Sequence, residues 1–280
     1  MKKLLIYILA LPMALFFSGC KKEMMGYEGK EGVYFAVQHG NKSLSINSWP
    51  FQPFSDVEFV RIGQSEVDFP VKVMITGPVK DYDRVFRLEV NPDSTTAVEG
   101  QHYAPLQTEW KVPAKQTSVD VKIRLKRSPD LENQAVTLGL RLVETNDFKL
   151  SFPEWDAIPS LTGGIVVKEF DASLHTLRIN DLMIQPAVWP GSIQAGNRES
   201  GLFGAFTRKK MQFLIDNLGL KYEDFASSET MPQARYLLVA SDAAEILKAR
   251  FNANNPVLED DGRLMFIGSV PWTSIIGVPF

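Results

Sequence analysis

The chain has 280 residues, of which 45% are hydrophobic and 22% charged, and its formal net charge is −3. This composition is typical of a globular protein with room for one large domain or two modest ones. The near-neutral charge and the absence of long Lys/Arg runs exclude a nucleic-acid-binding footprint.

The first twenty residues have the pattern of an export signal. Lys2 and Lys3 give a positive start, and residues 4–17 form an uncharged run that leads into Ser18-Gly19-Cys20. This run is shorter than the ~20 residues that a transmembrane helix needs, and it fits the apolar core of a signal peptide. The alternative interpretation is a buried N-terminal helix that happens to end in Gly-Cys.

Small residues before a lone cysteine resemble the lipobox of bacterial lipoprotein signal peptides, although Phe17 stands where Leu is usual. The resemblance implies that residues 1–19 are removed and that Cys20 is acylated, which anchors the protein to a membrane. Several acyl chains on one residue suffice for stable anchoring. Because Cys20 is the single cysteine, the anchored protein would have no disulfide, thiolate metal site or cysteine nucleophile.

Residues 20–32 are charged, contain glycine and have no apolar period, so we expect a tether. Lys21-Lys22-Glu23, directly after the cysteine, resembles the charged export signals of surface lipoproteins in the Bacteroidota. That resemblance implies an outer-membrane protein that faces the cell exterior. An ordinary solvated linker is the alternative.

From residue 33 to residue 168 the apolar residues alternate with polar ones in short segments, which is typical of half-buried strands. Strands are expected at 33–37, 56–62, 67–75, 85–90, 118–125 and 135–143. Turn residues separate these segments and no helical pattern joins them. The sequence therefore predicts a mostly β protein with an immunoglobulin-like antiparallel β-sandwich at residues 33–168.

The segment 97–103 (AVEGQHY) resembles a motif of the Calx-beta type of immunoglobulin-like domain. In that family an Asp stands in the place of His102 and a Gly in the place of Lys115. The resemblance implies a turn at Gly100 and a buried anchor at Tyr103. Loss of the Asp weakens any case for calcium. We expect no metal and no other cofactor.

The order of these features also resembles Bacteroidota lipoproteins of domain-of-unknown-function family 4843. Members have a lipobox, an E-G-x-x-x-F-like first strand, an E-G-x-x-Y segment and a Trp-containing C-terminal region. The matching residues are Glu31, Gly32, Phe35, Glu99, Gly100, Tyr103 and Trp189. Members often accompany starch-utilisation-type transporters of the outer membrane, which implies a supporting role in carbohydrate utilisation.

Residues 169–280 differ in pattern and predict a smaller mixed α/β region. Helices are expected from Thr207 to Gly219 and from Pro232 to Phe251, because apolar residues recur there at helical spacing between capping residues. A loop is expected at 185–204 and a closing strand at 264–267.

Catalytic motifs are scarce. His39, His102 and His175 are the three histidines, and none lies in a metal-binding or nucleophile motif. We therefore expect no enzyme activity. A triad can assemble from distant segments, and two carboxylates can meet in a cleft, so a cryptic hydrolase is kept as the least favoured alternative.

Exposed aromatic rings bind sugars by stacking on their apolar C–H faces. Trp49, Phe51 and Phe54 lie in a proline-rich loop, and Trp189 lies in a segment punctuated by Pro and Gly. These four residues are the candidates for glycan stacking. The alternative is that each ring fills the edge of a core.

Asp93-Ser94-Thr95 resembles the acceptor pattern for O-glycosylation in Bacteroidota proteins and follows a proline turn, so we expect it to be exposed. Ser94 is therefore a candidate modification site. A chance match to so short a pattern is an equal alternative.

Together these features predict a non-catalytic cell-surface lipoprotein that is an accessory or glycan-binding component of an outer-membrane nutrient-uptake system. Its expected partners are the membrane, through lipid on Cys20, a polysaccharide and a transporter complex. The second hypothesis is an interaction module that docks on a transporter or another surface protein through sheet edges.

Overall fold

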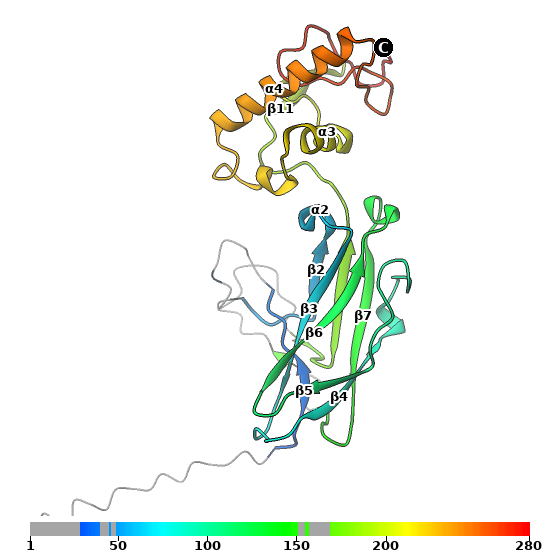
Figure 1. Ribbon diagram of the computed structural model, residues 1–280, viewed down its shortest axis with the longest axis vertical. Coiled ribbons are helices and arrows are strands. Elements are labelled where there is room, and N and C mark those ends of the chain that lie inside the picture. The colour runs from blue at the N-terminus through cyan, green and yellow to red at the C-terminus, as the bar shows by residue number, and fades with distance from the viewer. Residues whose placement is uncertain (1–28, 40–44, 46–48, 151–154, 157–168) are drawn as a thin grey trace, which may run out of the picture.

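The computed structural model describes residues 29–39, 45, 49–150, 155–156 and 169–280. The expected signal peptide at 1–19, the lipidation site Cys20 and most of the expected tether lie outside these residues. A β-sandwich and a C-terminal part rich in helices are stacked end to end (Figure 1). In the described part of the chain, no helix has both the length and the apolar character needed to cross a membrane.

The sandwich consists of a three-stranded and a five-stranded sheet. The first has the order β1 (Val33–Phe35), β3 (Glu66–Ile75), β6 (Ser118–Lys126). The second has the order β2 (Phe54–Glu58), β10 (Leu174–Asn180), β7 (Val136–Val143), β4 (Arg84–Val90), β5 (Glu109–Val112). Neighbouring strands are antiparallel except β2 and β10, which are parallel. The predicted immunoglobulin-like sandwich is thus confirmed, with one parallel pair that was not expected.

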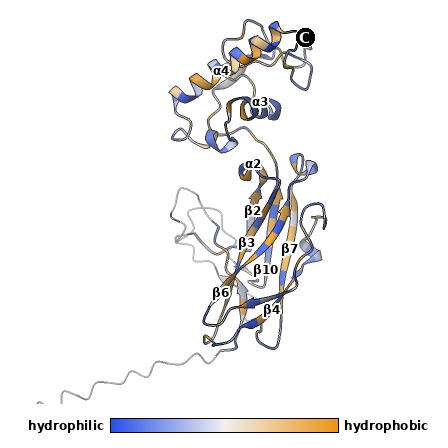
Figure 2. Cartoon of the chain, in the orientation of Figure 1, coloured by the Kyte–Doolittle hydropathy of each residue, from blue (hydrophilic) through white to orange (hydrophobic). Residues whose placement is uncertain are grey.

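Alternation along the strands explains the core of the sandwich. In β6, Val121, Ile123 and Leu125 are buried, whereas the residues between them are exposed. Successive side chains of a strand point to opposite faces, so each sheet has one apolar face, and the two faces pack together. Each fully buried Leu or Ile contributes about 1.5–3 kcal/mol. Figure 2 shows hydrophobic and hydrophilic residues mixed along β3, β6 and β7, as this alternation requires.

Both limits of the sandwich differ from the expected ones. At the N-terminal side, the amide of Lys149 donates to the carbonyl of Glu31, and the amide of Thr76 donates to the carbonyl of Gly32. The end of the expected tether is therefore part of the sandwich. At the other side, β10 lies between β2 and β7, so the boundary expected after residue 168 is too early.

The strand expected at 56–62 is wrong in its second half. β2 ends at Glu58, and a short helix, α2 (Phe59–Ile62), follows it. Gly63 ends this helix in the left-handed conformation, with φ at 68°, which glycine adopts without steric cost. The helix turns the chain at the end of the sandwich that meets the C-terminal part (Figure 1).

The C-terminal part begins with a hairpin and continues with helices. Its elements are β11 (Gly191–Gln194), β12 (Arg198–Gly201), α3 (Arg208–Leu218), η6 (Tyr222–Ala226) and α4 (Gln233–Asn252). Both predicted helices are confirmed, and the Thr207 hydroxyl accepts from the amide of Lys210 at 3.0 Å, as an N-cap should. The hairpin corrects the loop expected at 185–204.

The strand expected at 264–267 is also wrong. Those residues are mostly buried, but their backbone forms one isolated bridge, from Leu264 to Leu258. Short elements complete the described fold: η3 (Pro92–Ser94), η4 (Pro129–Glu132), β8 (Trp155–Asp156) and β9 (Glu169–Phe170).

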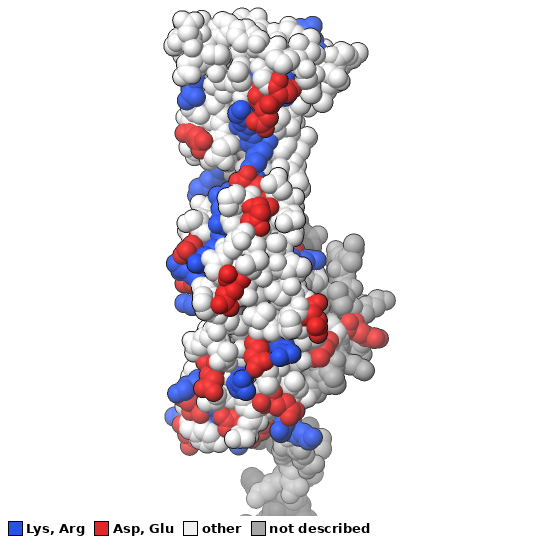
Figure 3. Space-filling view, turned by 90° about the vertical axis from the view of Figure 1, so that its right-hand side faces the viewer, with Lys and Arg blue, Asp and Glu red and all other residues white. Residues whose placement is uncertain are grey.

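Ion pairs hold the junction of the two parts. Asp181 directly follows β10 and accepts from Arg127 of the sandwich at 2.8 and 3.0 Å and from Arg208 of α3 at 3.1 Å. Arg61 of α2 donates to Glu223 of η6 at 2.6 Å. Figure 3 shows charged side chains over the sandwich and the junction, whereas the far end of the C-terminal part carries few on that face.

Candidate functional site

Three rings meet beside the start of β2. The ring of His39 lies 5.0 Å from that of Phe54 and 6.4 Å from that of Trp49, measured between centroids. The side-chain amide of Gln38 donates to the carbonyl of Trp49 at 2.9 Å and positions the loop. Two polar partners complete the group, which we call the β2-edge cluster: His39, Trp49, Phe54, Asp56 and Arg178.

The polar half of this cluster joins two strands. Arg178 of β10 lies directly opposite Asp56 of β2 in the parallel register. Its Nε and Nη2 donate to the two carboxylate oxygens at 2.6 and 2.9 Å, and its guanidinium carbon lies 3.7 Å from the centroid of the Phe54 ring. A bidentate ion pair and a cation–π contact therefore hold one guanidinium in place. The Nε2 atom of His39 lies 3.5 Å from Asp56.

The cluster is accessible from solvent. The side chains of Arg178 and Asp56 are 44% and 34% exposed, and that of His39 is 35% exposed. Guanidinium and imidazole N–H groups can donate, the carboxylate can accept, and the rings supply apolar surface. Because Asp56 neutralises Arg178, this arrangement suits a hydroxyl-rich ligand more than an ionic one.

The structure brings together only part of the predicted aromatic set. Trp49 and Phe54 belong to the cluster, and Phe51 lies on the same loop, half-buried and bridged to Gln38 through the backbone. Arg178 and Asp56 were missed. Asp56 lies two residues after Phe54 on the same strand face, which is a readable signal, but its partner Arg178 is 122 residues away.

Trp189 is a core residue, and its expected role as an exposed platform is wrong. Its side chain lies among Phe203, Phe206 and Phe225, with ring centroids 4.9, 5.0 and 6.0 Å away. The indole N–H donates to the carbonyl of Gly204 at 3.1 Å. Packing against three phenylalanines leaves 7% of the residue exposed.

Ser94 lies at the end of η3 on the outer side of β7, where it is half-buried and not fully exposed as expected, because it packs against Gly139. A Cβ atom added to Gly139 of β7 would come within 2.0 Å of the Ser94 hydroxyl oxygen. The hydroxyl therefore points toward the sheet. Its glycosylation stays a prediction, and it would require the η3 turn to open.

Ser55 and His175 form a buried pair. The hydroxyl of Ser55 lies 3.0 Å from Nε2 of His175, and the two residues are 4% and 1% exposed. Burial lowers the pKa of His175 to about 3. Within the described residues Nδ1 has no hydrogen-bond partner, so no acid orients the ring. An imidazole with so low a pKa is a weak general base at neutral pH.

His102 stabilises the turn of the Calx-beta-like motif. Its Nδ1 accepts from the amide of Val98 at 2.8 Å, so Nε2 carries the proton and donates to Asp130 at 2.8 Å. Tyr103 is 5% exposed and fills the expected anchor position. Lys115 adopts a left-handed φ of 64° in the place where that family has Gly.

No group of three or more His, Cys, Asp or Glu residues in the described ranges is placed to hold a metal ion. Asp130 instead serves the turn. Hydrogen bonds from the hydroxyl of Ser128 and from His102 lower the pKa of its carboxyl group below the ordinary range.

A buried ion network lies inside the C-terminal part and was missed from the sequence. The Nζ atom of Lys210 lies 2.6 Å from Glu199 and 3.5 Å from Glu259, and Arg263 donates to Glu199 at 3.2 Å. The side chains of Lys210 and Glu199 are both 0% exposed. Burial would raise the pKa of Glu199, but Lys210 and the other donors hold it below its ordinary value.

The network joins α3 to the hairpin and to the C-terminal segment, so its evident role is structural. One feature of the sequence indicates this network. Lys210 lies three and four residues before Phe213 and Leu214, on the buried side of α3. A lysine on an apolar helix face needs a carboxylate partner.

Comparison with known proteins gave one family match. Residues 27–163 match the family described as Domain of unknown function (DUF4843), the family that the order of sequence features resembles. The match does not include Trp189. No curated protein matches the chain.

Solved structures show weak similarity. The apo form of the Calx CBD1 domain is 15% identical, over 55% of this chain and 98% of that domain, with a TM-score of 0.33. A protein of unknown function from Bacteroides ovatus is 13% identical, over 52% of this chain and 43% of that one, with a TM-score of 0.33.

Proposed function

We propose that this chain, whose residues 27–163 match the DUF4843 family, is a non-catalytic lipoprotein that binds glycans at the cell surface. In this proposal Cys20 carries the lipid anchor, the outer membrane holds it, and the protein assists a nutrient-uptake system. The pattern of residues 1–23 supports the anchor and the location.

The β2-edge cluster is the observation that carries the binding role. Phe54 and Trp49 supply rings, and Arg178, Asp56 and His39 supply donors and an acceptor within the same surface. The described part of the chain contains a Ser–His pair, but it is buried and lacks an orienting acid. Binding without catalysis is therefore the function that this surface supports best.

The test is binding of the full-length chain, purified in detergent, to an array of plant, host and microbial polysaccharides. Phe54→Ala and Arg178→Ala should each weaken binding about tenfold, which corresponds to ~1.4 kcal/mol. Arg124→Ala is the matched control, because Arg124 forms an exposed ion pair with Glu66 on the other sheet. Silence across the whole array would contradict the proposal.

The second candidate function is docking on a transporter or another surface protein. The last seventeen residues, 264–280, contain no charged residue, and Val278 and Phe280 are 53% and 73% exposed. An exposed apolar patch of this kind is typical of interaction surfaces. Capture of a transporter from detergent extracts, together with a silent glycan array, would favour this function.

A further inference from the structure

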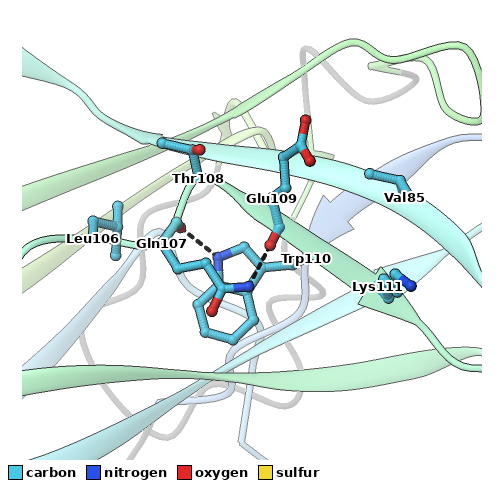
Figure 4. Close-up of a pocket in the computed structure, with 7 residues that line it drawn as sticks. All are labelled: Val85, Leu106, Gln107, Thr108, Glu109, Trp110 and Lys111. Carbon is cyan, nitrogen blue, oxygen red and sulfur yellow. Dashed lines mark hydrogen bonds between the residues drawn. The ribbon is translucent and has the colours of Figure 1, made fainter.

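A groove runs along the edge of the five-stranded sheet that is opposite to β2. One hollow of about 720 Å³ is lined by Val85 and residues 106–111 (Figure 4). A second, of about 670 Å³, is lined by Val85, Arg87, Glu109, Lys149 and residues 144–147. The two share Val85 and Glu109, so we treat them as one feature, the β5 groove. Each volume lies within the ≈ 300–1,000 Å³ of ordinary ligand sites.

The groove follows the free edge of β5. Consecutive residues of a strand point to opposite faces, so a hollow that touches all of residues 106–111 must run along the strand edge. In Figure 4 the indole of Trp110 and the carboxylate of Glu109 accordingly point away from each other. A ligand in the groove would contact the ring on one side and the carboxylate on the other.

Two hydrogen bonds fix the aromatic wall. The indole N–H of Trp110 donates to the carbonyl of Gln107 at 2.7 Å, and the side-chain amide of Gln107 donates to the carbonyl of Glu109 at 2.5 Å (Figure 4). These bonds fold the preceding loop back onto the strand. Trp110 is half-buried, so part of its surface faces the hollow that it lines.

The groove also offers polar groups that nothing else occupies. The carboxylate of Glu109 and the ammonium group of Lys111 are exposed, and neither has a hydrogen-bond or ion-pair partner in the described part of the chain. Both side chains lie on one face of β5, two residues or ~6–7 Å apart.

Backbone groups of Lys111 face the same edge. The amide of Leu88 donates to Thr108, which makes these residues a hydrogen-bonded pair of the β4–β5 ladder. Hydrogen-bonded and non-hydrogen-bonded pairs alternate in an antiparallel ladder. The pair of Val85 and Lys111 is therefore non-hydrogen-bonded, and the N–H and C=O of Lys111 point away from β4. The Val85 amide confirms this alternation, because it donates to Asp147 on the other side, at 2.7 Å.

The charges of the groove balance. The groove is lined by three acidic residues, Glu109, Glu144 and Asp147, and by three basic residues, Arg87, Lys111 and Lys149. No net field selects an ion. A peptide strand would lose one of its acceptors on this edge, because the side chain of Gln107 already donates to the carbonyl of Glu109. Hydroxyl groups, which both donate and accept, match the remaining groups best.

We propose that the β5 groove is a second glycan site, which takes a neutral polysaccharide. A sugar ring packs against Trp110, and hydroxyls bond to Glu109 and to the side chain and backbone of Lys111. This inference rests on the glycan-binding function proposed above, and it places a second contact at the opposite edge of the same sheet. The two edges are four strand spacings apart, roughly 19 Å.

A polymer that reaches both edges would bind more tightly than one that reaches either alone. Because the two edges are roughly 19 Å apart, a short oligosaccharide would engage only one site. A chain that reaches both must pass the η3 turn, which lies on β7 between them. Long chains should therefore bind more tightly per sugar than short ones.

The experiment measures retention of the full-length chain, in detergent, by gels that contain neutral polysaccharides. The deciding variant is Glu109→Ala with Lys111→Ala, which removes exposed, unpartnered side chains and leaves the core intact. Its control is Asp120→Ala with Lys122→Ala, an exposed acid and lysine with the same spacing on β6. Trp110→Ala is a second groove variant, checked for folding by circular dichroism.

We expect retention to fall about tenfold in the groove variants and to stay unchanged in the control. If the groove variants bind like the wild type while Phe54→Ala weakens binding, the β5 groove is overturned and the proposed function stands. If only the groove variants weaken binding, the groove stands and the β2-edge cluster is not a binding site. If no neutral polysaccharide is retained, or only extended peptides are, the inference is overturned.

Discussion

Burial keeps the imidazole of His175 neutral. The residue is 1% exposed, and loss of hydration lowers its pKa to about 3. Its Nε2 atom has Ser55 as a partner at 3.0 Å, whereas Nδ1 has none among the described residues. A proton on this ring would place an unpaired charge between the two sheets.

We predict that stability falls as the pH is lowered below ~6.5, the pKa of His in the unfolded chain. The folded pKa is lower, so the unfolded state takes up the proton first. The contribution is complete above ~6.5 and is lost toward pH 3, with a slope of up to ~1.4 kcal/mol per pH unit. In the His175→Gln variant, the free energy of unfolding, measured with urea, should depend less on pH between pH 6.5 and 5 than it does in the wild type.

The matched control is His39→Gln. The side chain of His39 is 35% exposed, so this variant controls for the loss of a histidine that is not buried. An unchanged slope in His175→Gln would show that this imidazole is not the group responsible.

At the scale of elements, a glycine in the middle of β7 lets another segment cross the sheet. A Cβ atom at Gly139 would lie 2.0 Å from the Ser94 hydroxyl oxygen and 3.0 Å from the carbonyl oxygen of Asn91. The amide of Gly139 donates to the hydroxyl of Thr95 at 3.0 Å, and its carbonyl accepts from the amide of Asn91 at 2.8 Å. The η3 turn is therefore bonded directly to the outer side of the strand.

We predict that Gly139→Ala lowers the free energy of unfolding by about 1–3 kcal/mol, because the new methyl group overlaps Ser94. Adding Ser94→Gly removes the hydroxyl and should recover part of the loss. Denaturant unfolding of the single and double variants provides the measurement. A double variant no more stable than Gly139→Ala would mean that the clash is with the backbone of Asn91 instead.

At the scale of the whole molecule, the contact between the two parts combines an apolar contact of Val60 with the C-terminal core and ion pairs of differing burial. The side chain of Asp181 is 1% exposed and has an arginine from each part, whereas Glu223 in the Arg61 pair is 47% exposed. Salt screens exposed pairs far more than buried ones. Asp181 is therefore the residue expected to set the orientation of the parts.

We predict that Asp181→Asn loosens this junction. Without the carboxylate, Arg127 and Arg208 lose their shared charged acceptor, so the junction opposes relative motion less strongly. Limited proteolysis should cut residues 182–190 severalfold faster than in the wild type. Arg178→Ala, which breaks an ion pair within the sandwich, should not change that rate, and equal rates for all three proteins would contradict the prediction.

Local pattern was sufficient for most elements. The alternation in residues 67–75, 118–125 and 135–143 predicts strands because side chains alternate along an extended backbone. Thr207 and Gly219 bound a helix because their caps act on neighbouring residues. The aromatic half of the β2-edge cluster was also readable, since Trp49 and Phe54 share one proline-rich loop.

The tertiary structure alone decided which faces meet. Arg178 reaches Phe54 and Asp56 only because β10 pairs with β2 in parallel, and no local period specifies a neighbour so distant in the chain. Trp189 is flanked like a loop residue, yet phenylalanines from other segments bury it. Periodicity is a property of the backbone and is present in the sequence, whereas pairing and burial depend on contacts between distant segments.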